Sequence, residues 1–80
     1  MSTFVTGEYR TGLTADDARA LAISEGASHV KELSEGLTGY YRTTGYAAEF
    51  AMARREGHTW KLSIWRIRVI PTIPPDATPL

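Results

Sequence analysis

The sequence predicts an α+β fold in which a single helix packs on an antiparallel sheet of about four strands, in the order β-α-β-β-β. Three observations support this prediction. Residues 15–25 have the composition and the capping signals of one helix, the flanking stretches are rich in β-forming residues and turn signals, and 80 residues allow one domain. We expect that domain over residues 1–70, followed by an extended proline-rich tail over residues 71–80.

The first strand is expected over Phe4–Arg10, where the sequence alternates loosely and contains many β-forming residues. The helix follows, because Thr14 suits the N-cap and the carboxylates of Asp16 and Asp17 favour the positive end of the helix dipole. Gly26 is a natural stop for it. The buried face of this helix consists mostly of small side chains, which would let it lie close against a sheet: Ala18, Leu21, Ala22 and Ile23.

A second strand is expected over residues 27–33, because Gly26 interrupts the helix and short alternation follows it. Residues 34–39 (SEGLTG) are typical of a turn. A weak internal echo relates Thr6–Gly12 (TGEYRTG) to Thr38–Gly45 (TGYYRTTG). A duplication would explain this echo, but we favour two similar strand-and-turn segments, because Thr, Gly and Tyr are common at such places.

Residues 46–55 (YAAEFAMARR) are the ambiguous segment. Their composition favours a helix, but a helical arrangement leaves no clean apolar face. We favour a strand that forms a hairpin through a three-residue loop at residues 55–57 and continues into a long strand over residues 60–70. The core face of the hairpin would then contain these cross-strand pairs: Met52 with Trp60, Phe50 with Leu62 and Ala48 with Ile64.

The composition excludes several classes of protein. The chain has no cysteine, which excludes a disulfide framework, a thiolate zinc site and a cysteine nucleophile. No segment approaches the roughly 20 apolar residues of a membrane helix, and the N-terminus lacks the layout of a secretory signal, so we expect a cytoplasmic protein. Nine basic and nine acidic residues argue against a uniformly charged binder, but residues 1–38 carry a net charge of −3 and residues 39–80 one of +3.

Few residues could carry catalysis, so we expect a protein that is not an enzyme and needs no cofactor. His29 and His58 are the only histidines, and neither has the neighbours that a metal site requires. Asp16 and Asp17 are adjacent on the expected helix and would point about 100° apart, so capping explains them better than a catalytic pair. No phosphate-binding glycine loop and no nucleophile motif occurs.

The charged residues supply two candidate binding surfaces. An acidic surface would bind a protein partner and contains Asp16, Asp17, Glu25, Glu32 and Glu35. A basic surface, interleaved with aromatic side chains, would bind nucleic acid and contains Arg42, Arg54, Arg55, His58, Lys61, Arg66 and Arg68. Each set also has a structural explanation, as a solvated helix face or as protection of sheet edges. A third hypothesis is a homo-oligomer formed through an uncovered sheet face with Ala47, Ala51, Ala53 and Trp65.

The order of the elements, with a hairpin of the form F-A-x-A-R-x-E-G-x-x-W, resembles the small phage-encoded anti-CRISPR proteins that lay one helix on an antiparallel sheet. The resemblance is carried by Leu13, Thr14, Ala18, Ala22, Val30 and the segment Phe50–Trp60. It implies a non-enzymatic inhibitor that binds a CRISPR effector complex and blocks target DNA, and it assigns no site residues. We therefore expect a small binding protein that acts sterically and electrostatically, with direct nucleic-acid binding as the alternative.

Overall fold

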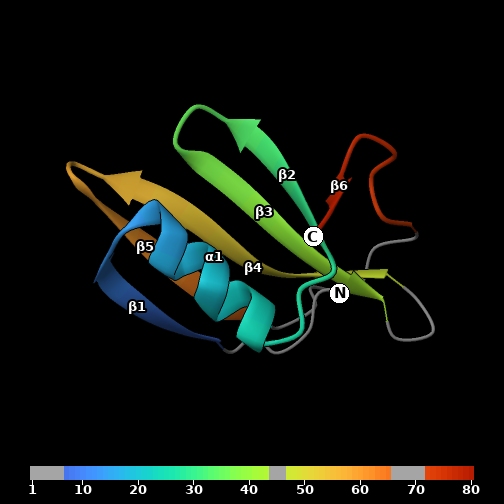
Figure 1. The fold of residues 1–80 in the computed structure, drawn as a ribbon, viewed down its shortest axis with the longest axis horizontal. Helices are drawn as coiled ribbons and strands as arrows, with labels where there is room; N and C mark the ends of the chain where they lie inside the picture. Colours follow the sequence, from blue (N-terminus) through green and yellow to red (C-terminus); the bar gives the residue numbers. More distant parts are fainter. Residues whose placement is uncertain (1–6, 44–46, 66–71) are drawn as a thin grey trace, which may run out of the picture.

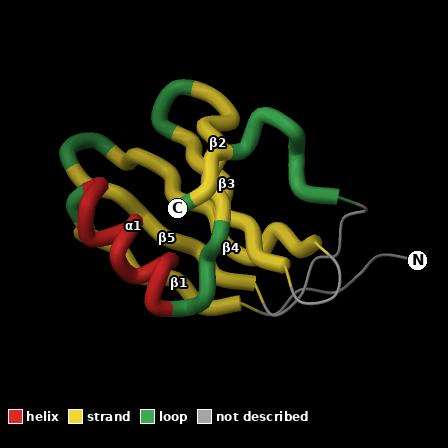
Figure 2. Tube along the Cα trace, turned by 45° about the vertical axis from the view of Figure 1, so that its right-hand side comes forward, coloured by secondary structure: helices red, strands yellow, loops and turns green. Residues whose placement is uncertain are grey.

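The protein is described by a computed structural model, which covers residues 7–43, 47–65 and 72–80. One helix and an antiparallel sheet confirm the predicted α+β class. The elements are β1 (Gly7–Leu13), α1 (Ala15–Ser24), β2 (His29–Ser34), β3 (Leu37–Thr43), β4 (Ala47–Glu56), β5 (Thr59–Trp65) and β6 (Thr78–Pro79). The strands are arranged in the order β1-β5-β4-β3-β2-β6, and α1 lies across one face of the sheet (Figures 1 and 2).

The described sheet has six strands, so the prediction of about four strands is wrong. One missed strand is β3. A turn was predicted over residues 34–39, but the observed turn contains only Glu35 and Gly36, and β3 begins directly after it. The other is β6, whose two residues pair with the start of β2 at the edge of the sheet. Proline is tolerated at an edge, because one side of such a strand needs no N–H donor. Residues 4–6 of the predicted first strand lie outside the described residues.

The helix α1 begins at the predicted residue and ends at Ser24, one residue before the predicted end. At its start, the Thr14 side-chain oxygen accepts a hydrogen bond of 3.0 Å from the backbone N–H of Asp17. At its end, the backbone N–H groups of Gly26 and Ala27 donate to carbonyls of the last turn at 2.9 and 3.0 Å. This pair of bonds is the Schellman motif, which satisfies carbonyls that the helix leaves without partners.

The strand β4 confirms that the ambiguous segment is a strand, but the predicted hairpin register is wrong. The loop contains two residues, Gly57 and His58, in place of three at residues 55–57. Gly57 has a φ of +67°, and a positive φ at the first loop position alone is typical of a type II′ turn. The observed pairs are Arg55 with Trp60, Ala53 with Leu62 and Ala51 with Ile64. They replace the predicted pairs Met52 with Trp60, Phe50 with Leu62 and Ala48 with Ile64.

A β-bulge in β4 nevertheless brings Phe50 into the core. Tyr40 of β3 pairs with Ala51, whereas the next residue, Tyr41, pairs with Glu49. Phe50 is therefore the extra residue of the bulge, which has no partner on β3. As a result, two successive residues of β4, Phe50 and Ala51, are both fully buried.

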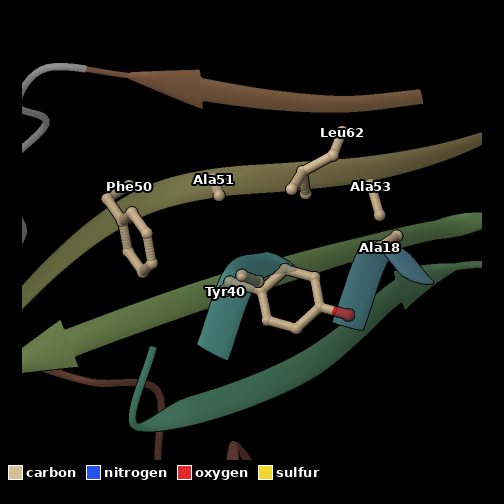
Figure 3. Close-up of a cluster of buried hydrophobic side chains, with 7 residues drawn as sticks. Ala18, Tyr40, Phe50, Ala51, Ala53 and Leu62 are labelled. Carbon is tan, nitrogen blue, oxygen red and sulfur yellow. The ribbon is translucent and has the colours of Figure 1, made fainter. Parts of the chain in front are cut away.

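The core between α1 and the sheet depends on small side chains (Figure 3). Its buried residues are Ala18, Ala22, Tyr40, Phe50, Ala51, Ala53 and Leu62. The small side chains of Ala18 and Ala22 allow α1 to approach the sheet closely, chiefly at β5, while the larger side chains fill the remaining space. The predicted small face of the helix is confirmed for Ala18 and Ala22, but Ile23 is 44% exposed and does not belong to it.

We expect Leu62→Ala to lower the free energy of unfolding by about 2–5 kcal/mol, because truncation of this fully buried side chain leaves a cavity under α1. Urea denaturation measures the change. Ile23→Ala is the matched control, and its effect should stay within about 0.5 kcal/mol because Ile23 is exposed. Similar losses for the two variants would contradict the assignment of the core.

Burial also raises the pKa of the Tyr40 phenol above its ordinary value of 10.0, and the charge of Arg19 opposes this shift in part. The folded protein therefore favours the neutral phenol. This contribution to stability is complete below the unfolded-state pKa of about 10 and is lost as the pH rises through the folded-state pKa. In urea titrations from about pH 9 to pH 11, wild type should lose stability more steeply than Tyr40→Phe. Parallel curves for the two proteins would contradict this.

Candidate binding surface

The sheet face opposite α1 is the candidate binding surface, and we call it the open face. Side chains alternate along a strand, so residues between the core positions of β4 and β5 point to this face. Five of them line a groove of about 290 Å³: Met52, Arg54, Glu56, Lys61 and Ser63. We call this feature the open-face groove.

Two cationic side chains lie opposite each other in the open-face groove. Arg54 of β4 and Lys61 of β5 are cross-strand partners, which places their Cβ atoms about 4.5–5.5 Å apart. Neither takes part in an ion pair of the described residues, although Glu56 lines the same groove. Like charges at directly opposite positions destabilise an antiparallel pair. An anion bound between Arg54 and Lys61 would relieve this repulsion.

A tyrosine of the edge strand β1 borders the groove. The Lys61 ammonium nitrogen lies 4.4 Å from the centroid of the Tyr9 ring, within the range of a cation–π interaction. Tyr9 pairs with Ser63 across the β1–β5 ladder, so its ring reaches Lys61 diagonally. Because Tyr9 is 61% exposed, it is accessible to a partner that binds the groove.

The other end of the open face is closed around Gly39. A Cβ atom at this position would lie 3.0 Å from the Tyr41 hydroxyl oxygen and 3.4 Å from a Glu49 carboxylate oxygen, so these side chains would have to shift to admit a larger residue. Tyr41 and Glu49 themselves are buried. Among the described residues of this face, those of the open-face groove at the hairpin end are therefore more accessible than Tyr41 and Glu49.

The acidic residues that the sequence analysis singled out lie on several elements. Asp16 and Asp17 are in the first turn of α1, Glu25 follows its last residue, Glu32 is on β2 and Glu35 is in the turn after β2. Ten helical residues, about 15 Å, separate the two ends of α1. The carboxylate of Glu35 lies 3.9 Å from the Arg55 guanidinium group. The five acidic residues are thus distributed over α1, β2 and the turn after β2.

The basic residues of the hairpin are divided between the two faces of the sheet. Arg54 shares the open face with Lys61, whereas its neighbour Arg55 pairs with Trp60 on the helix side. His58 is exposed in the hairpin loop. Arg66 and Arg68, which the sequence analysis also included, lie outside the described residues.

Arg42, the remaining residue of the basic set, closes the C-terminal end of α1. Its guanidinium carbon lies 4.7 Å from the centroid of the Phe50 ring, and its Nη1 atom donates a 3.5 Å hydrogen bond to the Glu25 carbonyl. A cation at this end also interacts favourably with the helix dipole. Arg42 therefore has a structural role that explains its position without a ligand.

The predicted oligomerisation face is wrong for two of its four residues. Ala51 and Ala53 are 0% and 2% exposed and pack in the core with the helix. They faced outward in the prediction because the hairpin register was shifted. The side chains of Ala47 and Trp65, the other two members, lie outside the described part of the structure.

The two histidines lie at opposite ends of the sheet. His29 is at the start of β2, where its Nδ1 atom lies 2.9 Å from the Ser28 hydroxyl oxygen. His58 is in the loop between β4 and β5, near the end at which β2 finishes. Within the described ranges, no group of three or more His, Cys, Asp or Glu side chains could hold a metal ion. No helix in the same ranges is long and apolar enough to span a membrane.

Comparison with known proteins yields no relative: no family model, no curated protein and no solved structure matches this chain. The geometry of the groove is therefore the basis for a functional proposal.

We expect Arg54→Glu to raise the free energy of unfolding by about 0.2–1 kcal/mol, because it replaces two like charges by a cross-strand pair of opposite charges. Arg54→Gln, which removes the repulsion without adding attraction, should give a smaller gain. Urea denaturation at about 0.02 M and 1 M salt should show the gain shrinking as salt screens the pair. Destabilisation by Arg54→Glu at low salt would contradict the unpaired arrangement.

Proposed function

We propose that this chain is a small binding protein without catalytic activity, which binds an anionic surface of a protein partner through the open-face groove. The observation that carries this proposal is the pair Arg54 and Lys61, which oppose each other on a face that α1 does not cover. The described residues supply neither with an acidic partner. Such a pair weakens the free protein and becomes favourable when an anion binds, a common compromise at functional sites.

The other groove residues favour a protein over nucleic acid as the partner. Glu56 lines the same groove and would repel a chain of phosphates, whereas a carboxylate on a folded protein can approach the cations alone. Met52 adds an adaptable apolar surface, which suits side chains next to that carboxylate. In addition, the net charge of zero provides no long-range attraction for a polyanion.

The specific role that we propose, from the resemblance to anti-CRISPR proteins, is inhibition of a CRISPR effector complex. In this role the bound chain obstructs target DNA. A basic groove does not complement the basic channel in which such a complex would hold nucleic acid. We infer that the groove would bind an acidic part of the effector and that the bulk of the domain would block access sterically.

Direct binding of single-stranded nucleic acid is the second candidate function. It is favoured by the exposed Tyr9 ring beside Lys61 and Arg54, since aromatic rings stack on bases and the two cations could contact phosphates. Two such contacts predict a weak dependence on salt, with a slope of about −1.4 for log K against log salt concentration.

A pair of charge-matched variants tests the proposed surface. Arg54→Glu/Lys61→Glu alters the groove, and Arg10→Glu/Arg19→Glu changes the net charge equally at exposed sites on the helix side of the sheet. A partner captured by the wild-type chain from native-host extract is identified by mass spectrometry and purified for titration. We expect the control to bind like wild type and the groove variant at least about tenfold more weakly.

Equal affinities for all three proteins would rule out the open-face groove as the docking surface. Fluorescence anisotropy with a labelled 20-nucleotide single strand separates the second candidate from the first. Binding with the predicted salt slope, lost only in the groove variant, would favour nucleic acid over a protein partner.

A further inference from the structure

The outer edge of β2 is a surface separate from the open-face groove. On its inner side, β2 pairs with β3 from His29 to Ser34. On its outer side, β6 pairs only with His29 and Val30. No described strand covers the remaining stretch, residues 31–34, on that side. A strand edge of this kind presents backbone N–H and C=O groups to an additional strand.

The C-terminal segment of the chain shows what this edge accepts. Thr78 and Pro79 run antiparallel to β2, and the backbone N–H of Leu80 donates a 2.9 Å hydrogen bond to the Ser28 carbonyl. Two residues before Thr78, the Asp76 carboxylate lies 3.3 Å from the Lys31 ammonium group. Figure 1 shows this segment beside β2, at the edge of the sheet away from α1. The edge therefore accepts an extended segment with a carboxylate that reaches Lys31.

The contacts that hold this segment are few and exposed. Two residue pairs form the ladder, and the hydrogen bond from Leu80 to Ser28 extends it by one residue. Asp76 is 66% exposed in its ion pair, so water and salt screen the attraction to Lys31. A competing segment with more ladder hydrogen bonds would replace it.

We propose that the β2 edge binds an extended segment of a partner protein, which displaces Asp76–Leu80 and pairs along the whole of β2. Two side chains define the chemistry of that segment. Lys31 requires a carboxylate in the place of Asp76, and Leu33, which is 37% exposed beyond the end of β6, provides an apolar contact. The C-terminal segment is then a built-in competitor that keeps the edge covered until a partner binds.

Wild type and two variants test this proposal. Asp76→Lys replaces the ion pair by repulsion from Lys31 and frees the edge. His29→Cys/Pro79→Cys locks the segment in place when oxidised, because a pair in which Pro79 lacks an N–H is not hydrogen-bonded and has the close Cα spacing that a disulfide needs. The chain has no other cysteine, so the bond is unambiguous by mass spectrometry. Circular dichroism checks that all forms keep the fold.

The probe is a fluorescein-labelled peptide with the sequence of residues 72–80, TIPPDATPL, added to each form. We expect Asp76→Lys to bind it at least about fivefold more tightly than wild type, because the competing segment occupies the edge less often. The oxidised double-cysteine form should not bind, and reduction should restore binding. A probe with Lys in the place of Asp should bind Asp76→Lys more weakly, because it cannot pair with Lys31.

Three results would overturn the proposal. Equal affinity for the locked and the unlocked forms would place the peptide elsewhere, and no binding by Asp76→Lys would show that the edge accepts no segment in trans. Dimerisation of Asp76→Lys without peptide, measured by light scattering, would assign the edge to a second copy of this chain.

Discussion

The packing of the alanine face of α1 on the sheet, chiefly on β5, determines the rest of the architecture. Ala18 and Ala22 on the helix and Ala51 and Ala53 in the core are almost completely buried. The methyl groups of Ala18 and Ala22 let the helix lie close to the sheet, and a larger side chain at either position would push the two layers apart. A single helix of ten residues held in this way covers one face of the sheet. The same constraint therefore leaves the open face available for binding.

Local signals in the sequence were sufficient for the helix and for the nature of the ambiguous strand. Thr14 and Gly26 mark the ends of α1 through hydrogen bonds within a few residues, so no distant contact was needed to predict them. The hairpin register was not accessible in the same way. Gly57 fits a loop of two residues as well as one of three, and only the pairing of whole strands decides between them. The strand β3 was missed because Gly36 and Gly39 made its first half resemble a turn.

The candidate site could be predicted as a set of charges but not as a surface. Arg54 and Lys61 were both named from the sequence, together with Arg55 and Arg42, which the structure places elsewhere. The distribution of these basic residues between the two faces depends on strand register and on side-chain alternation, and a count of charges contains neither. Tyr9 was missed because β1 pairs with β5, the strand farthest from it in the sequence among the five longer strands, so that no local pattern links their residues.

The bulge at Phe50 shifts the alternation of side chains between the two faces of β4 by one residue. Glu49 and Met52 share the open face although three positions separate them, a spacing that places two residues on opposite faces of a regular strand. Loss of one residue beside Phe50 would restore the regular alternation and exchange the faces of one half of the strand relative to the other. The number of residues in β4 at the bulge, more than their side-chain chemistry, therefore decides which face a charge occupies. It determines whether the Arg54 side chain points to the open face or toward the helix.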